Sequence, residues 1–226
     1  MSRTRPLALT CPECQASLQA EVVESVNVDR DPQLRDAILE GTFQRFDCAC
    51  GVSIQLEPEA LSYLDVGRKQ WLVFQPHGNL ADWRAQETGV QTLFDQALGS
   101  QASAPAQELG RGISPRLVFG WPALREKLLA RELGLDDVGL ECVKLALIKD
   151  QGIVPEAGQE LRLSGRRGEA LVLEHLDVSS RDVLHTYGVP QGLYQEISAD
   201  SGWASLVAQL SAGPFVDVQR LWLGEG

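Results

Sequence analysis

Four of the five cysteines lie in two tight pairs, and such thiols are strong candidates for metal ligands. Cys11 and Cys14 stand in CPEC, Cys48 and Cys50 stand in CACG, and 33 residues separate the two pairs. Structural zinc takes four ligands in a tetrahedron, and thiolates at short spacing can turn inward from one tight loop. Gly51 permits the positive φ that such a loop often needs. The sequence therefore predicts one structural zinc site with Cys11, Cys14, Cys48 and Cys50 as its ligands.

Two alternatives use some of the same residues. A CxxC pair can be a redox site, which would make Cys11 and Cys14 exchange with disulfide substrates. A glutaredoxin-like CPxC opens a helix after a strand, whereas a strand-like stretch follows Cys14 here. The second pair has only one residue between its thiols, so His77 is an alternative fourth ligand if that short loop fails.

The other side chains that could take part in chemistry are expected to have structural roles. Cys142 lies in a nearly continuous apolar stretch, where a free cysteine behaves as a small hydrophobe. His175 and His185 show no spacing typical of metal binding and are expected to lie on the surface or in packing contacts. Asp136 is explained as a helix cap. Since no nucleotide-binding or nucleophile motif appears, the sequence offers no catalytic residue.

The elements that must position the cysteines form a small sheet in the first part of the chain. Alternation predicts a strand over 18–28, a strand at 52–56, and two strands joined by a turn at 66–69. A helix is predicted between the cysteine pairs. Asp31 suits its N-cap, Pro32 suits its first turn, and Gly41 suits the position after its last turn. Apolar spacing over 80–98 predicts one broken helix or two short ones.

The second part of the chain is predicted as a separate domain. Residues 99–112 are rich in Gly, Ser, Ala, Pro and Gln, which is typical of a linker. After it we expect a strand at 116–119, two helices, a hairpin with its turn at 165–168, a short helix and a final strand. The predicted fold class is thus α+β: a zinc-ribbon-like antiparallel sheet module with a trailing helix over 9–98, the linker, and a C-terminal α/β half over 113–226 with a hairpin and helices.

Composition and charge narrow the classes of partner. The chain has 226 residues and a formal net charge of −11, with 5 basic and 11 acidic side chains over residues 1–65 and 12 and 16 over residues 111–226. Affinity for nucleic acid comes largely from Lys and Arg, so this charge argues against it. No apolar run approaches the ~20 residues that a membrane-spanning helix needs, and the N-terminus does not resemble a secretory signal. We expect a cytoplasmic protein.

One segment resembles a known family. CPECQASLQAEVVESVNVDRDPQLRDAILEGTFQRFDCACGVSIQLEPEALSYLD is similar to the CpXC domain of bacteria and archaea in its CPxC opening, its NV-x-x-DP-x-L segment and its returning F-x-C pair. The resemblance covers about residues 9–76 and implies a zinc-binding module. Members of the family usually carry CPxC in both pairs, whereas Cys48 and Cys50 stand in CAC here. The resemblance supplies no catalytic residues.

The sequence favours a non-enzymatic, zinc-stabilised protein that binds another protein or acts as an adaptor. The alternatives are a thiol-redox protein that uses Cys11 and Cys14, and a zinc ribbon associated with nucleic acid. Depressed thiol pKa values with disulfide exchange would identify the first alternative, and salt-dependent binding to DNA or RNA would identify the second.

Overall fold

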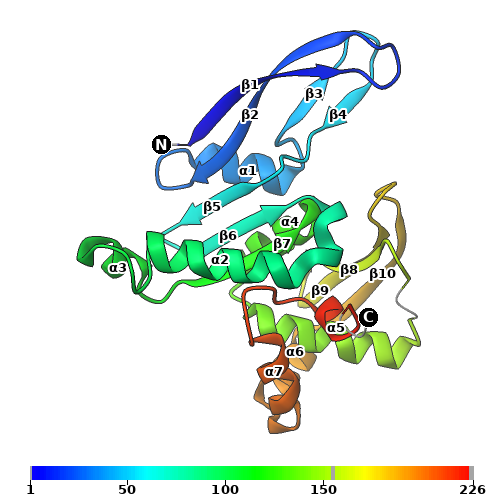
Figure 1. Ribbon diagram of the computed structural model, residues 1–226. Coiled ribbons are helices and arrows are strands. Elements are labelled where there is room, and N and C mark those ends of the chain that lie inside the picture. The colour runs from blue at the N-terminus through cyan, green and yellow to red at the C-terminus, as the bar shows by residue number, and fades with distance from the viewer. Residues whose placement is uncertain (1, 154–155, 224–226) are drawn as a thin grey trace. The chain divides into compact units, whose positions relative to one another are not determined.

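The computed structural model describes residues 2–153 and 156–223 and confirms a mixed α+β chain (Figure 1). The described residues form seven α-helices and ten strands. They divide into two compact units, Met1–Trp121 and Pro122–Gly226, called here the N-terminal unit and the C-terminal unit.

The N-terminal unit is built on a five-stranded sheet with the order β1-β2-β5-β6-β7. The strands are β1 (Arg3–Thr10), β2 (Ser17–Asn27), β5 (Leu61–Asp65), β6 (Gln70–Gln75) and β7 (Ser114–Phe119). A separate two-stranded sheet pairs β3 (Arg45–Asp47) with β4 (Ser53–Gln55). The strand pairs β1–β2 and β5–β6 are antiparallel.

The expected purely antiparallel sheet is corrected at two places. The pairs β2–β5 and β6–β7 are parallel. Parallel neighbours need a long crossover connection rather than a tight turn. Helix α1 with the β3–β4 hairpin provides the first crossover, and two helices provide the second.

The helix between the two cysteine pairs has the predicted boundaries. Helix α1 spans Pro32–Glu40, and Gly41 follows it in the left-handed conformation with φ 73°. Asp31 occupies the N-cap position, but its side chain does not cap the helix. Its carboxylate instead accepts a 2.5 Å hydrogen bond from the Ser2 hydroxyl. The N-cap residue thus ties the helix start to the beginning of the chain.

The predicted linker is structured and belongs to the N-terminal unit. Helix α2 is one continuous helix, Trp83–Ala97, preceded by a 3-10 turn, η1 (His77–Asp82). Helix α3 (Ala104–Gly110) lies inside the predicted linker. Strand β7 pairs with β6, so the division between units falls at Trp121 and Pro122 instead of at 99–112. Residues 99–112 are rich in turn-forming residues, which is why they were predicted as a linker. However, Ser103 and Pro105 also suit the start of a helix.

Two glycines of this region are expected to respond to alanine in opposite directions. A methyl group added at Gly89, inside α2, meets no atom within 4 Å, whereas at Gly110 it meets the Leu98 carbonyl oxygen at 2.2 Å. Gly89→Ala should raise the free energy of unfolding by about 0.5–1 kcal/mol because glycine is a poor helix former. Gly110→Ala should lower it by about 1–3 kcal/mol through overpacking. Urea unfolding of both variants checks the pair, and equal shifts would contradict the packing of α3 against the end of α2.

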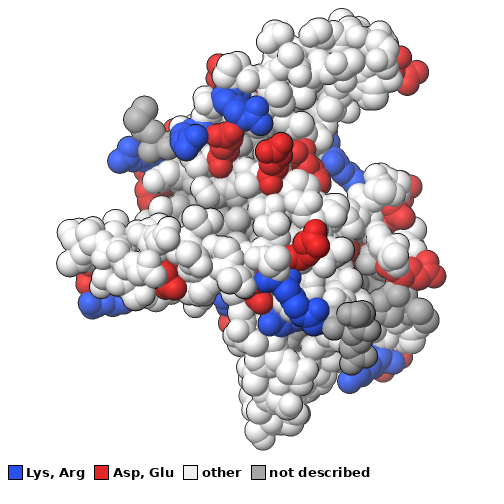
Figure 2. Space-filling view, viewed as in Figure 1, with Lys and Arg blue, Asp and Glu red and all other residues white. Residues whose placement is uncertain are grey.

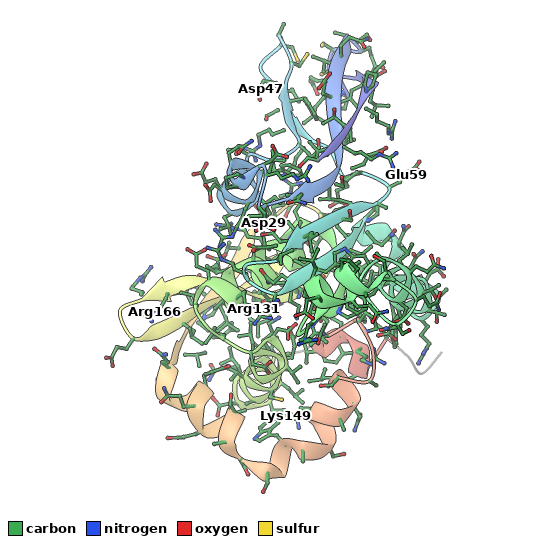
Figure 3. All side chains as sticks on the ribbon, turned by 90° about the vertical axis from the view of Figure 1, so that its left-hand side faces the viewer. Asp29, Asp47, Glu59, Arg131, Lys149 and Arg166 are labelled. Atoms are coloured by element: carbon green, nitrogen blue, oxygen red, sulfur yellow. The ribbon has the colours of Figure 1, made fainter. Side chains whose placement is uncertain are left out.

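In its described residues, the C-terminal unit combines four helices with a three-stranded antiparallel sheet of order β10-β9-β8. Its elements are α4 (Gly120–Glu132, which begins two residues before the division), α5 (Asp137–Gln151), β8 (Gln159–Arg167), β9 (Ala170–Asp177), β10 (Val183–Pro190), α6 (Gln191–Ala199), α7 (Ala204–Leu210) and the 3-10 turns η2 (Ser201–Trp203) and η3 (Val218–Leu221). The predicted helices and hairpin are present, and Arg166 lies at the end of that hairpin (Figure 3). Asp136 caps α5 as predicted, since its carboxylate accepts from the Gly139 N–H at 2.8 Å.

Two expectations for this unit differ from the structure. Strand β10 and helix α6 were not predicted, and the expected final strand is instead the turn η3. The apolar alternation of that segment resembles a strand. However, the Asp217 carboxylate accepts from the Gln219 N–H at 2.9 Å, which favours a tight turn.

Charged side chains are buried together inside the C-terminal unit. The buried charge cluster consists of Glu126, Lys127, Glu141, Lys144, Glu160, Arg162 and Asp217, each at most 4% exposed. Lys144 Nζ lies 2.5 Å from Glu126 Oε1 and 3.0 Å from Glu141 Oε1. Arg162 lies 2.6 Å from Asp217 and 2.8 Å from Glu160. Buried charges of this kind must be paired, and these are.

The buried charge cluster also holds the end of the described chain. Lys127 Nζ donates to the Val216 carbonyl at 2.7 Å, and the Val218 N–H donates to Glu141 at 2.9 Å. Burial would raise the pKa of Asp217, but the charges of Arg162 and Lys144 outweigh it and lower that pKa. Residues 215–219 are therefore fastened by ion pairs and backbone hydrogen bonds to α4, α5 and β8.

Candidate metal centre

The first cysteine pair forms the tight turn of the β1–β2 hairpin. The Cys11 N–H donates to the Ala16 carbonyl at 2.9 Å, and the Gln15 N–H donates to the Cys11 carbonyl at 3.0 Å. Gln15 has φ 60°, which closes the turn. The chain therefore reverses within the CPEC motif, and both thiols stay at one end of the hairpin.

The second pair forms the turn of the β3–β4 hairpin. The Cys48 N–H donates to the Val52 carbonyl at 2.8 Å, and the Gly51 N–H donates to the Cys48 carbonyl at 2.9 Å. Gly51 adopts φ 92°, the positive value that the sequence led us to expect. Asp47, the residue before Cys48, marks this end of the hairpin in Figure 3. The shortened CAC spacing thus still forms a closed loop.

The two hairpin turns bring four sulfurs into one cluster. The Sγ atoms of Cys11, Cys14, Cys48 and Cys50 all lie within 4.8 Å of one another. The closest contacts join the two loops: Cys11 to Cys50 at 3.6 Å, and Cys14 to Cys48 at 3.5 Å. Cys11 and Cys48 are buried, whereas Cys14 and Cys50 are exposed. This cysteine tetrad could hold a metal ion, with one buried and one exposed ligand from each loop.

The backbone of each loop affects the thiols electrostatically. Hydrogen bonding from the Cys14 backbone N–H, with help from that of Glu13, outweighs burial and lowers the pKa of Cys11 to about 7. The Cys50 backbone N–H also acts to lower the pKa of Cys48, but the neighbouring thiols and burial raise it to about 12. The first loop therefore favours the thiolate form of Cys11 more than the second loop favours that of Cys48. Amides directed at sulfur also suit a metal-bound thiolate, which carries the same negative charge.

The sequence matches a known protein family over more than half of its length. Residues 9–144 match the family described as "CpXC protein". The chain belongs to the CpXC family. The match includes both cysteine loops and extends well past residues 9–76, the segment that resembles the family in its motifs. No curated protein and no solved structure matches.

The other candidate ligands of this CpXC chain lie outside the tetrad. Within residues 2–153 and 156–223, no other group of three or more His, Cys, Asp or Glu side chains is arranged to hold a metal ion. His77 begins η1, and its backbone N–H donates to Glu57 at 3.2 Å. His175 and His185 face each other on β9 and β10. Burial raises the pKa of Cys142 to about 11, so this thiol behaves as the predicted core residue.

Two structural elements of the CpXC chain were missing from the sequence interpretation. Strand β1, which leads directly into Cys11, was not predicted, although Leu7 and Leu9 are the less exposed positions of an alternating pattern. The buried charge cluster was signalled only by Glu141 and Lys144, the two polar residues in the apolar stretch of α5.

No helix among the described residues is both long and apolar enough to span a membrane.

Proposed function

We propose that the cysteine tetrad binds one zinc ion with a structural role. Zinc–sulfur bonds of ~2.3 Å in a tetrahedron place neighbouring sulfurs about 3.8 Å apart. The two closest pairs, at 3.5 and 3.6 Å, and the 4.8 Å limit for all pairs are compatible with that tetrahedron after small adjustments. Four thiols with no carboxylate or imidazole form the donor set of a closed structural site. The tetrad is the observation that supports this proposal.

The chain's own residues explain what the ion would do. Two hairpin turns supply two thiols each, and the β3–β4 hairpin has only three residues in each strand. Such a short hairpin has little stability by itself. A zinc ion held by both turns would cross-link the hairpins at their ends.

Metal content is the direct test of this site. We expect one zinc per chain by elemental analysis and native mass spectrometry of the purified protein. Cys50→Ser removes an exposed thiol without changing the core and should lower zinc occupancy strongly. Cys142→Ala changes the one cysteine outside the tetrad and should keep full occupancy. A zinc-free native protein, or equal occupancy in both variants, would contradict the assignment.

For the cellular role, we propose a non-enzymatic protein that binds another protein or acts as an adaptor. Thiolates that all bind zinc are not free for disulfide exchange, which speaks against the thiol-redox alternative. The sequence pI of about 4.7 speaks against binding to nucleic acid. Acidic and basic side chains are interspersed over the face shown in Figure 2.

Proximity labelling in cells tests this role. The wild-type chain should enrich a reproducible set of proteins, and Cys50→Ser should lose part of that set if the zinc-bound hairpins form the binding surface. Enrichment of nucleic acid, or disulfide exchange with a model substrate at a rate that Cys11→Ser abolishes, would instead support one of the alternatives.

A further inference from the structure

Each exposed thiol of the cysteine tetrad lies beside a buried thiol from the other loop. Cys50 is exposed, and its Sγ lies 3.6 Å from that of Cys11, which is 0% exposed. Cys14 is exposed, and its Sγ lies 3.5 Å from that of Cys48, which is 6% exposed. The tetrad therefore contains the same arrangement twice: a thiol open to solvent, in contact with a shielded thiol of the opposite loop.

This arrangement is typical of cysteines that react reversibly with oxidants. Hydrogen peroxide reaches an exposed thiol first and converts it to a sulfenic acid. A second thiol nearby then condenses with the sulfenic acid to form a disulfide, which prevents irreversible oxidation. In both closest contacts of the tetrad, this second thiol belongs to the other loop.

Cys142 provides the internal comparison. It lies on α5 in the apolar core of the C-terminal unit and is 1% exposed. The other four cysteines all belong to the N-terminal unit, so Cys142 has neither solvent access nor a second thiol in its own unit. We expect it to stay reduced under conditions that oxidise the tetrad.

We propose that the tetrad is a site of oxidation by hydrogen peroxide, and that it forms two disulfides between the loops, Cys11–Cys50 and Cys14–Cys48. For each disulfide, the oxygen–oxygen bond of one peroxide breaks, the exposed thiol becomes a sulfenic acid and one water leaves. The buried thiol then displaces a second water as the sulfur–sulfur bond forms. Two thiols are thus oxidised and one peroxide is reduced to two waters. A pair that starts as thiolates takes two protons from solvent.

The disulfides join the same two hairpin turns that the proposed zinc ion joins. Each sulfur pair has to close by about 1.5 Å to reach the bond length of ~2.05 Å. In one consequence the inference rests on the proposed function: a disulfide sulfur lacks the thiolate charge that binds zinc, so oxidation releases the ion. The hairpin ends stay cross-linked after this loss, whereas a chelator leaves them unlinked.

Peptide mapping of the full-length chain after treatment with excess hydrogen peroxide tests the pairing. No Lys or Arg separates Cys11 from Cys14 or Cys48 from Cys50, whereas three arginines lie between the two pairs. Trypsin therefore leaves each loop in its own peptide. We expect the two peptides to be joined by disulfides, and Cys142 to be recovered as a thiol. The chain oxidised in urea is the reference, because short separations then favour closure within each loop.

Two serine variants assign the partners. In Cys50→Ser, we expect Cys14 to pair with Cys48 and Cys11 to remain a thiol. In Cys14→Ser, we expect Cys11 to pair with Cys50 and Cys48 to remain a thiol. Because Glu13 lies between Cys11 and Cys14, cleavage after glutamate shows which of these two carries the bridge.

Bridges within a loop of the native wild-type chain, or sulfinic acids in place of bridges, would overturn the proposal. So would a Cys11–Cys48 bridge in Cys50→Ser. Zinc release, followed with a colour-forming chelator, separates this proposal from the zinc proposal. If a metal-free native chain forms both bridges between the loops, only the zinc assignment fails. If the chain keeps its zinc and its four thiols in excess peroxide, only the oxidation proposal fails.

Discussion

Removal of the proposed zinc ion is expected to unfold the hairpin ends that carry the cysteines. Structural zinc contributes on the order of 10–16 kcal/mol of apparent binding free energy in small modules, and that energy is coupled to folding. Here all eight residues of β1 are exposed or partly exposed, so apolar burial can replace little of this contribution. A strong chelator should therefore increase amide exchange around both loops, residues 9–18 and 45–55, and lower the temperature of the first thermal transition.

The rest of the molecule provides the control for this prediction. Residues with their own apolar core, such as Phe74 and Leu117, are each at most 1% exposed in the sheet of the N-terminal unit, and the C-terminal unit has a separate core. Amides of α5 should exchange at the same rate with and without chelator. Cys50→Ser should already show the faster exchange and should respond little to the chelator. Unchanged exchange at both loops in the wild type after zinc loss would contradict a structural role.

Loss of one carboxylate from the buried charge cluster is expected to have the second large effect. Glu126 is fully buried and contacts Lys144 at 2.5 Å, Arg162 at 3.1 Å and the Leu163 N–H at 2.6 Å. Glu126→Ala leaves these donors without that acceptor in a site shielded from water. Removing one partner of a buried ion pair typically costs about 3–5 kcal/mol, and we expect a loss of that size in the free energy of unfolding. Urea unfolding measures it.

Two further variants separate charge from shape. Arg125→Ala removes an exposed charge from the same helix and should change the free energy of unfolding by no more than about 0.5 kcal/mol. Glu126→Gln keeps the size of the side chain and one acceptor oxygen, so it should lose less than Glu126→Ala. If Glu126→Ala and Arg125→Ala proved equally mild, the cluster would not stabilise the unit through its ion pairs.

Local chemistry made the cysteine tetrad largely predictable. The cysteine spacing, Gly51 and the punctuation of α1 by Pro32 and Gly41 act within a few residues, and the structure has the same local features. The four thiols do converge, as the prediction of one shared site requires. Sequence spacing could not give the pairing between loops, in which Cys11 lies nearest Cys50 and Cys14 lies nearest Cys48. That pairing depends on how two hairpins pack.

Non-local pairing explains most of the differences. Parallel contacts between β2 and β5 and between β6 and β7 join strands far apart in sequence, which alternation within one strand does not specify. The residues that neutralise Glu141 and Lys144 come from α4 and, for Arg162, from β8. Helix α3 lies in the predicted linker because small and polar residues, with a proline near the start, also suit a short helix.

The fastening of residues 215–219 into the buried charge cluster has a consequence for biosynthesis. Glu126, Glu141 and Arg162 leave the ribosome well before Asp217 and the Val218 amide that complete their contacts. Domains tend to fold in order as the chain emerges, at about 5–20 residues per second. Until residues 215–219 have emerged, the helices and sheet of the C-terminal unit lack the segment that completes the buried ion pairs. Emergence of residues 215–219 is then the event that allows this unit to reach full stability, and a chain cut before them would leave Arg162 and Glu141 without these contacts.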